Sequence, residues 1–223
     1  MKHTYRWLAS SLEEFDILSA YVTNVESQLQ KGLLTFVKDF QEYEIDAGDY
    51  IHVGGVYDGL DDSGWDIRDI YQNFFPNLHR CSVFMTLYSV FENDLNRLCQ
   101  HLEHKLNLKL KVSDLSGKGI DRAKLYLTKV ANLDLSALSS HQFWNEIKHI
   151  QQVRNAIVHR NAQLDNDKTL RAYIESCDYL TSQNSSIILL EGFLAHVLSN
   201  MRGVYELISE QVRAVEKNGL FDS

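Results

Sequence analysis

The sequence contains a single proline, Pro76, and only eleven glycines among its 223 residues. Proline and glycine are the residues that most disfavour a helix interior, so long stretches of this chain can continue as helix. With 44% hydrophobic and 11% aromatic residues the chain can also bury a core, which excludes a disordered protein. We therefore expect an all-α fold in a single helical domain over residues 1–223.

Apolar residues recur at spacings of three and four along five segments, the periodicity of helices with one buried face. The segments cover residues 12–43, 67 or 77 to 107, 120–132, 140–162 and 190–217. The residues near 179–190 predict either two short strands joined by a turn or a loop that leads into the last helix. Together these features predict an up-and-down bundle of four to six helices.

Residues 44–66 interrupt the helical pattern with five glycines and seven acidic residues. A long irregular segment inside a domain is often a lid or a mobile connector, and the alternation in "DYIHVGGVY" is also compatible with a short hairpin across Gly54 and Gly55. The segment belongs to an acidic region, because residues 1–66 carry thirteen acids and four bases, a net charge of −9. Residues 67–223 carry seventeen acids and eighteen bases, a net charge of +1. We expect an acidic N-terminal helix plus loop at 1–66 and a core at 67–217 that does not repel nucleic acid.

The three cysteines, Cys81, Cys99 and Cys177, are odd in number and widely spaced. This arrangement predicts neither a disulfide framework nor a set of metal ligands. The N-terminus lacks the apolar core of a signal peptide, and nowhere do eighteen apolar residues run together. The simplest expectation is a cytoplasmic protein without a membrane span.

The segment "QQVRNAIVHR", residues 151–160, places a permanent charge on the apolar side of the helix expected at 140–162. On a helical wheel Arg154 falls within an arc of about 80° that holds apolar side chains. These are Phe143, Ile147, Ile150 and Ile157. A separate polar stripe, about 60° wide, ends in a histidine. It consists of Lys148, Gln152, Asn155 and His159.

An arginine cannot lose its charge, so burying it without a partner is costly. Glu92 and Asp94 flank the apolar stripe of the long helix ending near 107, and we expect them to support and orient Arg154. If such a pair is all that Arg154 makes, it is a structural residue, and His159 is a surface residue near the end of its helix.

The residues "RNAIVH", 154–159, have the form R-N-x-x-x-H, which resembles the Arg-x(4–6)-His signature of the HEPN superfamily. Its members are helical bundles and often RNases. The segment "LYSVFENDLNRLC", 87–99, also resembles the long second helix of cytoplasmic members, in which an F-E pair precedes a leucine stripe. The resemblance covers roughly residues 80–215 and leaves the first 66 residues unexplained.

RNases of this family cleave RNA without a metal, by attack of the ribose 2′-hydroxyl on the adjacent phosphate. The resemblance implies that His159 is the general acid or base, that Arg154 binds the phosphate and that Asn155 orients the histidine or the scissile phosphate. It also implies a homodimer with a composite cleft, because Arg154 and His159 lie about 140° apart on one helix. We expect a metal-independent endoribonuclease of toxin, anti-phage defence or stress response, with RNA as its substrate, a possible antitoxin or operon partner, and no cofactor or metal.

Lys148 and Arg160 lie beside this motif and are candidates for contacts with the RNA backbone, although a solvated helix face also explains them. Two other functions are compatible with the sequence. One is a non-catalytic helical module that binds RNA or a protein, with Arg154 in a buried ion pair. The other is a nucleotide- or effector-sensing domain that is contacted through residues 44–66.

Overall fold

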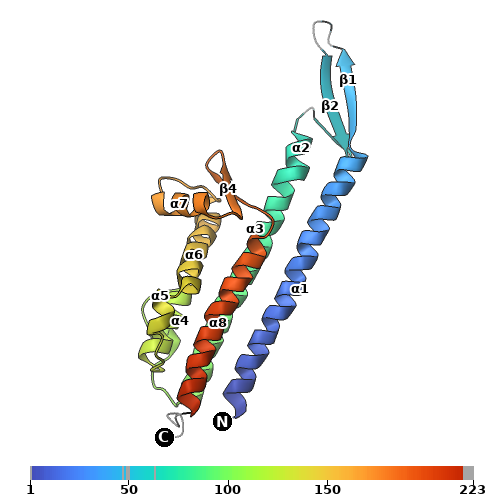
Figure 1. Ribbon diagram of the computed structural model, residues 1–223. Coiled ribbons are helices and arrows are strands. Elements are labelled where there is room, and N and C mark those ends of the chain that lie inside the picture. Colours follow the sequence, from blue (N-terminus) through green and yellow to red (C-terminus); the bar gives the residue numbers. More distant parts are fainter. Residues whose placement is uncertain (1, 47, 49–50, 63, 218–223) are drawn as a thin grey trace.

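Four long helices form the body of the protein in the computed structural model, which describes residues 2–46, 48, 51–62 and 64–217 (Figure 1). They are α1 (Lys2–Asp39), α3 (Phe75–Lys105), α6 (Gln142–Arg160) and α8 (Phe193–Lys217). The predicted helical bundle is confirmed, but two small antiparallel sheets mean that the fold is not purely α-helical. Within the described ranges no helix is both long and apolar enough to cross a membrane.

Shorter helical segments connect the long ones. Helix α2 (Ile67–Asp69) and a π-helical turn (Ile70–Phe74) lead without a break into α3. The π-helical turn lies directly before Pro76, where the missing N–H interrupts the α-helical hydrogen-bond pattern. The remaining segments are a 3-10 turn (Val112–Asp114), α4 (Gly119–Lys129), α5 (Ser136–Ser140) and α7 (Lys168–Ser176).

The segment expected to be an irregular loop contains a three-stranded antiparallel sheet, β1 (Gln41–Asp46), β2 (Ile51–Tyr57) and β3 (Leu60–Asp61). The prediction of a turn at Gly54 and Gly55 is wrong, because both glycines lie inside β2, opposite Tyr43 and Glu42. A side chain at Gly54 would collide with the ring of Tyr43, and one at Gly55 with the ring of Phe40. These glycines therefore make room for aromatic rings on the sheet. Residues 47, 49–50 and 63 of the predicted loop lie outside the described residues.

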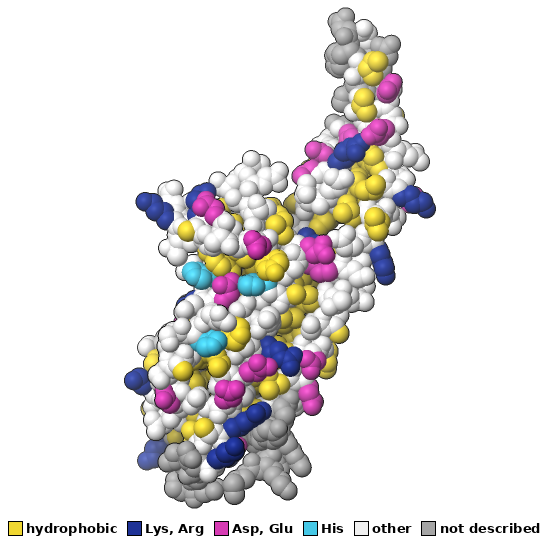
Figure 2. Space-filling view, in the orientation of Figure 1, with side chains coloured by type: hydrophobic (Ala, Val, Ile, Leu, Met, Phe, Trp, Pro, Cys, Tyr) yellow, Lys and Arg dark blue, Asp and Glu magenta, His cyan; other side chains and the backbone are white. Residues whose placement is uncertain are grey.

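The far end of α1, the sheet and residues 67–78 form an arm that extends beyond the rest of the bundle (Figure 1). Aromatic rings connect its parts. The ring of Phe36 stacks on that of Tyr71 with centroids 5.1 Å apart and meets the ring of Tyr57 edge-on at 5.0 Å. Several large apolar side chains of the arm are exposed, including Leu34 and Phe74. Hydrophobic side chains are accordingly visible along the arm in Figure 2.

The expected hairpin near 179–190 is confirmed as strands β4 (Leu180–Gln183) and β5 (Ser186–Leu189). The two residues between the strands, Asn184 and Ser185, both have positive φ, 50° and 63°. A two-residue turn with this backbone matches the twist of a hairpin, and asparagine tolerates it well. The positive φ angles at these two positions therefore explain why the turn consists of small polar residues.

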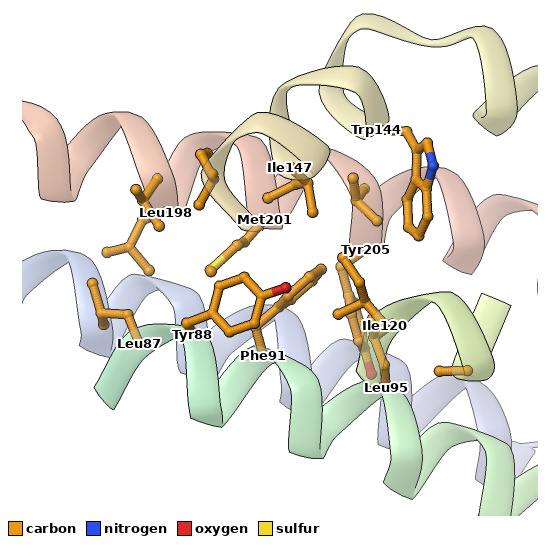
Figure 3. Close-up of a cluster of buried hydrophobic side chains, with 14 of the residues drawn as sticks. Leu87, Tyr88, Phe91, Leu95, Ile120, Trp144, Ile147, Leu198, Met201 and Tyr205 are labelled. Atoms are coloured by element: carbon orange, nitrogen blue, oxygen red, sulfur yellow. The ribbon is translucent and has the colours of Figure 1, made fainter. Parts of the chain in front are cut away.

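The core lies where α3, α6 and α8 meet (Figure 3). Tyr88 and Phe91 of α3 face Met201 of α8 and Ile147 of α6 in this view, and all four side chains are almost completely buried. Helices α6 and α8 approach closely at Gly203, where a side chain would collide with the ring of Phe143. The burial of these large side chains holds α6 against the other helices.

Arg80 and Glu26 form an ion pair between α3 and α1 that is almost fully buried, with 11% and 14% of the two side chains exposed. The Nε of Arg80 donates to one carboxylate oxygen at 3.0 Å and Nη2 donates to the other at 2.8 Å. Nη1 donates to the carbonyl oxygen of Leu189 at 3.4 Å, and the side-chain oxygen of Asn77 accepts from the Leu189 N–H at 2.8 Å. One turn of α3 thus fixes both α1 and strand β5.

Removing one partner of this pair is expected to destabilise the protein strongly. Glu26→Leu leaves the Arg80 guanidinium buried without a carboxylate and should lower the free energy of unfolding by about 3 kcal/mol. The double variant Arg80→Met, Glu26→Leu should recover most of that loss, since no unpaired charge remains. Urea denaturation measures both values. The control is Glu206→Ala, which breaks an exposed pair with Arg202 and should lower the free energy of unfolding by less than about 1 kcal/mol. If Glu26→Leu lowers it by no more than this control, the ion pair does not stabilise the fold as stated.

Candidate functional site

Helix α6 carries the predicted motif in its last two turns. The ring of His141 caps the start of the helix, since its Nδ1 accepts from the backbone N–H of Phe143 at 3.3 Å. The helix ends at Arg160 and is capped by Asn161, whose φ of 49° is left-handed. Its buried face is wider than the predicted arc, because it also includes three residues that the wheel left out. These are Trp144, Val153 and Ala156.

Arg154 is half-buried on this face and makes no ion pair within the described part of the chain. Its guanidinium carbon lies 5.7 Å from the centre of the Tyr88 ring, within range of a cation–π contact. Nη1 donates to the side-chain oxygen of Asn155 at 3.2 Å. The buried Nε has no acceptor among the described residues. The guanidinium is therefore supported by a ring and an amide rather than by a carboxylate.

The expected pairing of Arg154 with Glu92 or Asp94 is not found among the described residues. Asp94 accepts instead from Arg97, its neighbour on α3, at 3.1 Å. Burial, together with the nearby charge of Glu14 on α1, raises the pKa of the Asp94 carboxyl, so this residue belongs to the α1 side of the bundle. The side chain of Glu92, on α3, reaches the start of α4. Its Oε1 lies 3.2 Å from where a Cβ atom would stand on Gly119, the first residue of α4. A carboxylate there stabilises the helix dipole.

Tyr88, beneath the guanidinium, remains a neutral phenol. Its side chain is almost fully buried, and this burial raises the pKa of the hydroxyl well above its ordinary value. The charge of Glu92 raises the pKa further, and the charge of Arg154 opposes the increase. The phenol therefore gives Arg154 an aromatic surface but no counter-charge.

The other two cations of α6 are paired. Lys148 donates to Asp121 of α4 at 2.6 Å. Arg160 lies 3.8 Å from Asp165 and 3.6 Å from Asp167 in the segment that follows the helix. These carboxylates offset the charges of the two residues that were candidates for contacts with the RNA backbone. The structure thus leaves Arg154 as the cation of α6 that has no carboxylate among the described residues.

Asn155 and His159 are exposed and lie one turn apart on the same side of α6. Arg154 is separated from His159 by roughly 7.5 Å along the helix axis and about 140° around it. The hydrogen bond from Arg154 ends on Asn155, a member of the polar stripe that also carries His159. Arg154 and Asn155 are thus in contact, whereas Arg154 and His159 do not converge within one chain.

A second polar cluster was not predicted from the sequence. The Oε1 atom of Glu146 accepts from the hydroxyl of Tyr173 at 2.5 Å and lies 2.7 Å from Nε2 of His196. The ring of His149 stacks on that of Tyr173 at 4.6 Å. The cluster joins α6, α7 and α8. Its partners are separated by 27 and 50 residues in the chain, so no local pattern reveals it.

The chemistry of this cluster is that of a structural network. The hydrogen bond from His196 lowers the pKa of Glu146, and the bond from Tyr173 adds to this against the effect of burial. Burial and the Glu146 carboxylate raise the pKa of Tyr173, which therefore stays protonated and donates. Burial also raises the pKa of the adjacent Cys177 thiol, so it is not an activated nucleophile. Glu146 is the ionised centre that holds α7 against α6 and α8.

No group of three or more His, Cys, Asp or Glu side chains in the described ranges is arranged to hold a metal ion. Comparison with protein-family models, with curated protein sequences and with solved structures finds no match for this chain. The function therefore has to be argued from the residues of α6 and their surroundings.

The Glu146 network makes stability depend on pH. Because its pKa in the folded protein is lower than the ordinary value of 4.5, its contribution is complete above that value and is lost as the pH falls through the lowered pKa. Glu146→Gln should lower the free energy of unfolding at pH 7 by about 1 kcal/mol and flatten its decline in acid. Urea denaturation at a series of pH values measures this. The control is Glu175→Gln, an exposed acid on α7; identical pH profiles for all three proteins would refute the role of Glu146.

Proposed function

We propose that the protein is a metal-independent endoribonuclease of HEPN type, with its catalytic face on α6. The observation that carries the proposal is the state of Arg154. It lies on the packed side of α6, makes no ion pair with any described residue, and donates to the side chain of the exposed Asn155. A guanidinium supported by an amide and an aromatic ring is available for an anion, and phosphate matches its donors. The motif resemblance supplies the reaction class.

The reaction needs a proton shuttle and a cation. The ribose 2′-oxygen attacks the adjacent phosphorus, the bond from phosphorus to the 5′-oxygen breaks, and a cyclic phosphate and a 5′-hydroxyl remain. His159 moves the proton from the 2′-hydroxyl or toward the leaving 5′-oxygen, the role in which histidine is most common. Arg154 stabilises the charge that develops on the phosphate oxygens. Asn155 has its side-chain oxygen bound to Arg154, which leaves its N–H donors for the substrate.

A second copy of the chain completes the proposed site. Arg154 and His159 lie about 140° apart on one helix and converge poorly. We therefore propose a twofold axis beside α6 that would bring the Arg154 of one protomer near the partner's His159. We propose that this homodimer acts on RNA in defence or stress response. An antitoxin or a protein of the same operon would regulate it.

The catalytic role of His159 is tested with purified protein, total RNA and EDTA. His159→Ala should reduce cleavage by about 100-fold or more, the usual contribution of a general acid or base. His79→Ala, which removes another exposed histidine, should cleave like the unmodified protein. Equal cleavage by the His159→Ala and His79→Ala proteins, or no cleavage by the unmodified protein, would overturn the proposal.

Arg154 separates this proposal from the alternative of a binding module with a structural ion pair. Because Arg154 has a cation–π contact and one amide hydrogen bond, Arg154→Ala should lower the free energy of unfolding by only about 1 kcal/mol. Cleavage should nevertheless fall by about 100-fold, as when one donor to the transition state is removed. Urea denaturation and cleavage rates measure the two effects. A loss of stability as large as that of Glu26→Leu, with cleavage unchanged, would favour the binding module.

A further inference from the structure

A cleft of about 310 Å³ lies where the turn of hairpin β4–β5 approaches the start of α3. Figure 1 shows this hairpin beside the lower part of the arm. The cleft is lined mainly by carboxamide side chains, together with the ring of Phe74 and a single carboxylate, Asp69. The carboxamides are Asn73, Asn77, Gln163, Gln183 and Asn184. No lysine or arginine of the described residues lines it.

The walls of the cleft are fixed to one another by backbone hydrogen bonds. The N–H of Leu164 donates to the carbonyl of Ser185 at 3.0 Å, and that of Ile187 donates to the carbonyl of Ala162 at 2.9 Å. The Asn77 side chain accepts from Leu189 and so attaches the hairpin to α3. The carboxamides are therefore held on a rigid frame, which reduces the entropy lost when a ligand binds.

Much of the hydrogen-bonding capacity of these amides is unused. Gln163, Gln183 and Asn184 form no side-chain hydrogen bond with any described residue. Asn73 donates through Nδ2 to Asp69 at 2.8 Å, which leaves its carbonyl oxygen free, whereas Asn77 uses its oxygen and leaves its N–H donors. The cleft thus offers both donors and acceptors without a positive charge.

A neutral ligand with neighbouring donors and acceptors and a flat face fits this chemistry. The carboxamide of Asn or Gln pairs with adenine through its amino group and ring nitrogen, and an exposed aromatic ring such as that of Phe74 stacks on an unpaired base. The Asp69 carboxylate accepts from an amino group and repels phosphate. A nucleobase can therefore enter the cleft while its phosphate remains outside.

We propose that this cleft binds an unpaired adenine of the RNA strand that α6 cleaves. The inference rests on the proposed function, which supplies the RNA strand. Gln163 follows His159 by four residues, and its N–H donates to the carbonyl of Arg160 at 2.9 Å. Four residues span at most roughly 14 Å, so one strand can reach both places. The cleft then selects the sequence next to the cleaved bond.

Binding is measured with the His159→Ala protein, so that the RNA stays intact, and with labelled oligo(A) and oligo(U) of equal length by fluorescence anisotropy. Oligo(A) should bind more tightly than oligo(U). Phe74→Ala in the same background should weaken oligo(A) binding by about tenfold, the effect of losing one stacked base. Asn184→Gly, which keeps the positive φ of the turn, should reduce the preference for oligo(A).

Two neighbouring substitutions are matched controls. Phe75→Ala and Gln72→Ala remove exposed side chains of the same segment that do not line the cleft and should leave both affinities unchanged. Equal binding of oligo(A) and oligo(U), or equal losses for Phe74→Ala and Phe75→Ala, would overturn the proposal. Failure of the proposed function gives a different result: the unmodified protein would not cleave RNA, while the adenine preference and its loss in Phe74→Ala would remain.

Discussion

The buried ion pair of Arg80 and Glu26 connects three parts of the molecule that are distant in sequence. A desolvated pair is stable only with good geometry and satisfied donors, and here two donors of the guanidinium meet the carboxylate while a third meets the Leu189 carbonyl. The pair therefore fixes how α1 lies along α3 and where the end of β5 meets α3. Both the arm and the proposed base cleft depend on this arrangement, because the cleft is bounded by the start of α3 and by the hairpin that contains β5.

Helix α6 is held in a different way. Its position is set by apolar contacts of Ile147 and its neighbours. Two of its cations pair with acids from other segments, Lys148 with Asp121 and Arg160 with Asp165 and Asp167. This leaves a helix with little net positive charge around one unpaired guanidinium. This charge distribution agrees with the two proposed contacts to RNA. Arg154 binds a phosphate, and the neutral cleft near the end of α6 binds a base. Affinity for RNA would then come from specific contacts more than from a general positive surface.

The periodicity of apolar residues predicted the long helices because each buries one face, and the turn residues predicted the β4–β5 hairpin. The same reasoning failed at residues 44–66, where Gly54 and Gly55 look like a turn. A side chain at either position would collide with the ring of Tyr43 or Phe40. Such contacts with residues distant in sequence are not visible in a local pattern. The helical wheel also placed Arg154 on the correct face of α6. A wheel gives only the direction of a side chain around the helix axis, so it could not identify Tyr88 and Asn155 as the contacts of Arg154.

A comparison of two arginines of the bundle, Arg80 and Arg154, supports the proposed function from within one molecule. Arg80 has a structural role: it is almost fully buried, pairs with the carboxylate of Glu26, 54 residues away in the chain, and donates to the carbonyl of Leu189. Arg154 lies on an equally apolar surface, yet the nearest acids of α3 are directed elsewhere, Asp94 to Arg97 and Glu92 to the start of α4. A half-buried guanidinium without a counter-charge contributes little to stability. We propose that an anion from outside the chain supplies the missing counter-charge, and Asn155, whose side-chain oxygen is bound to Arg154, keeps its N–H donors for the same phosphate.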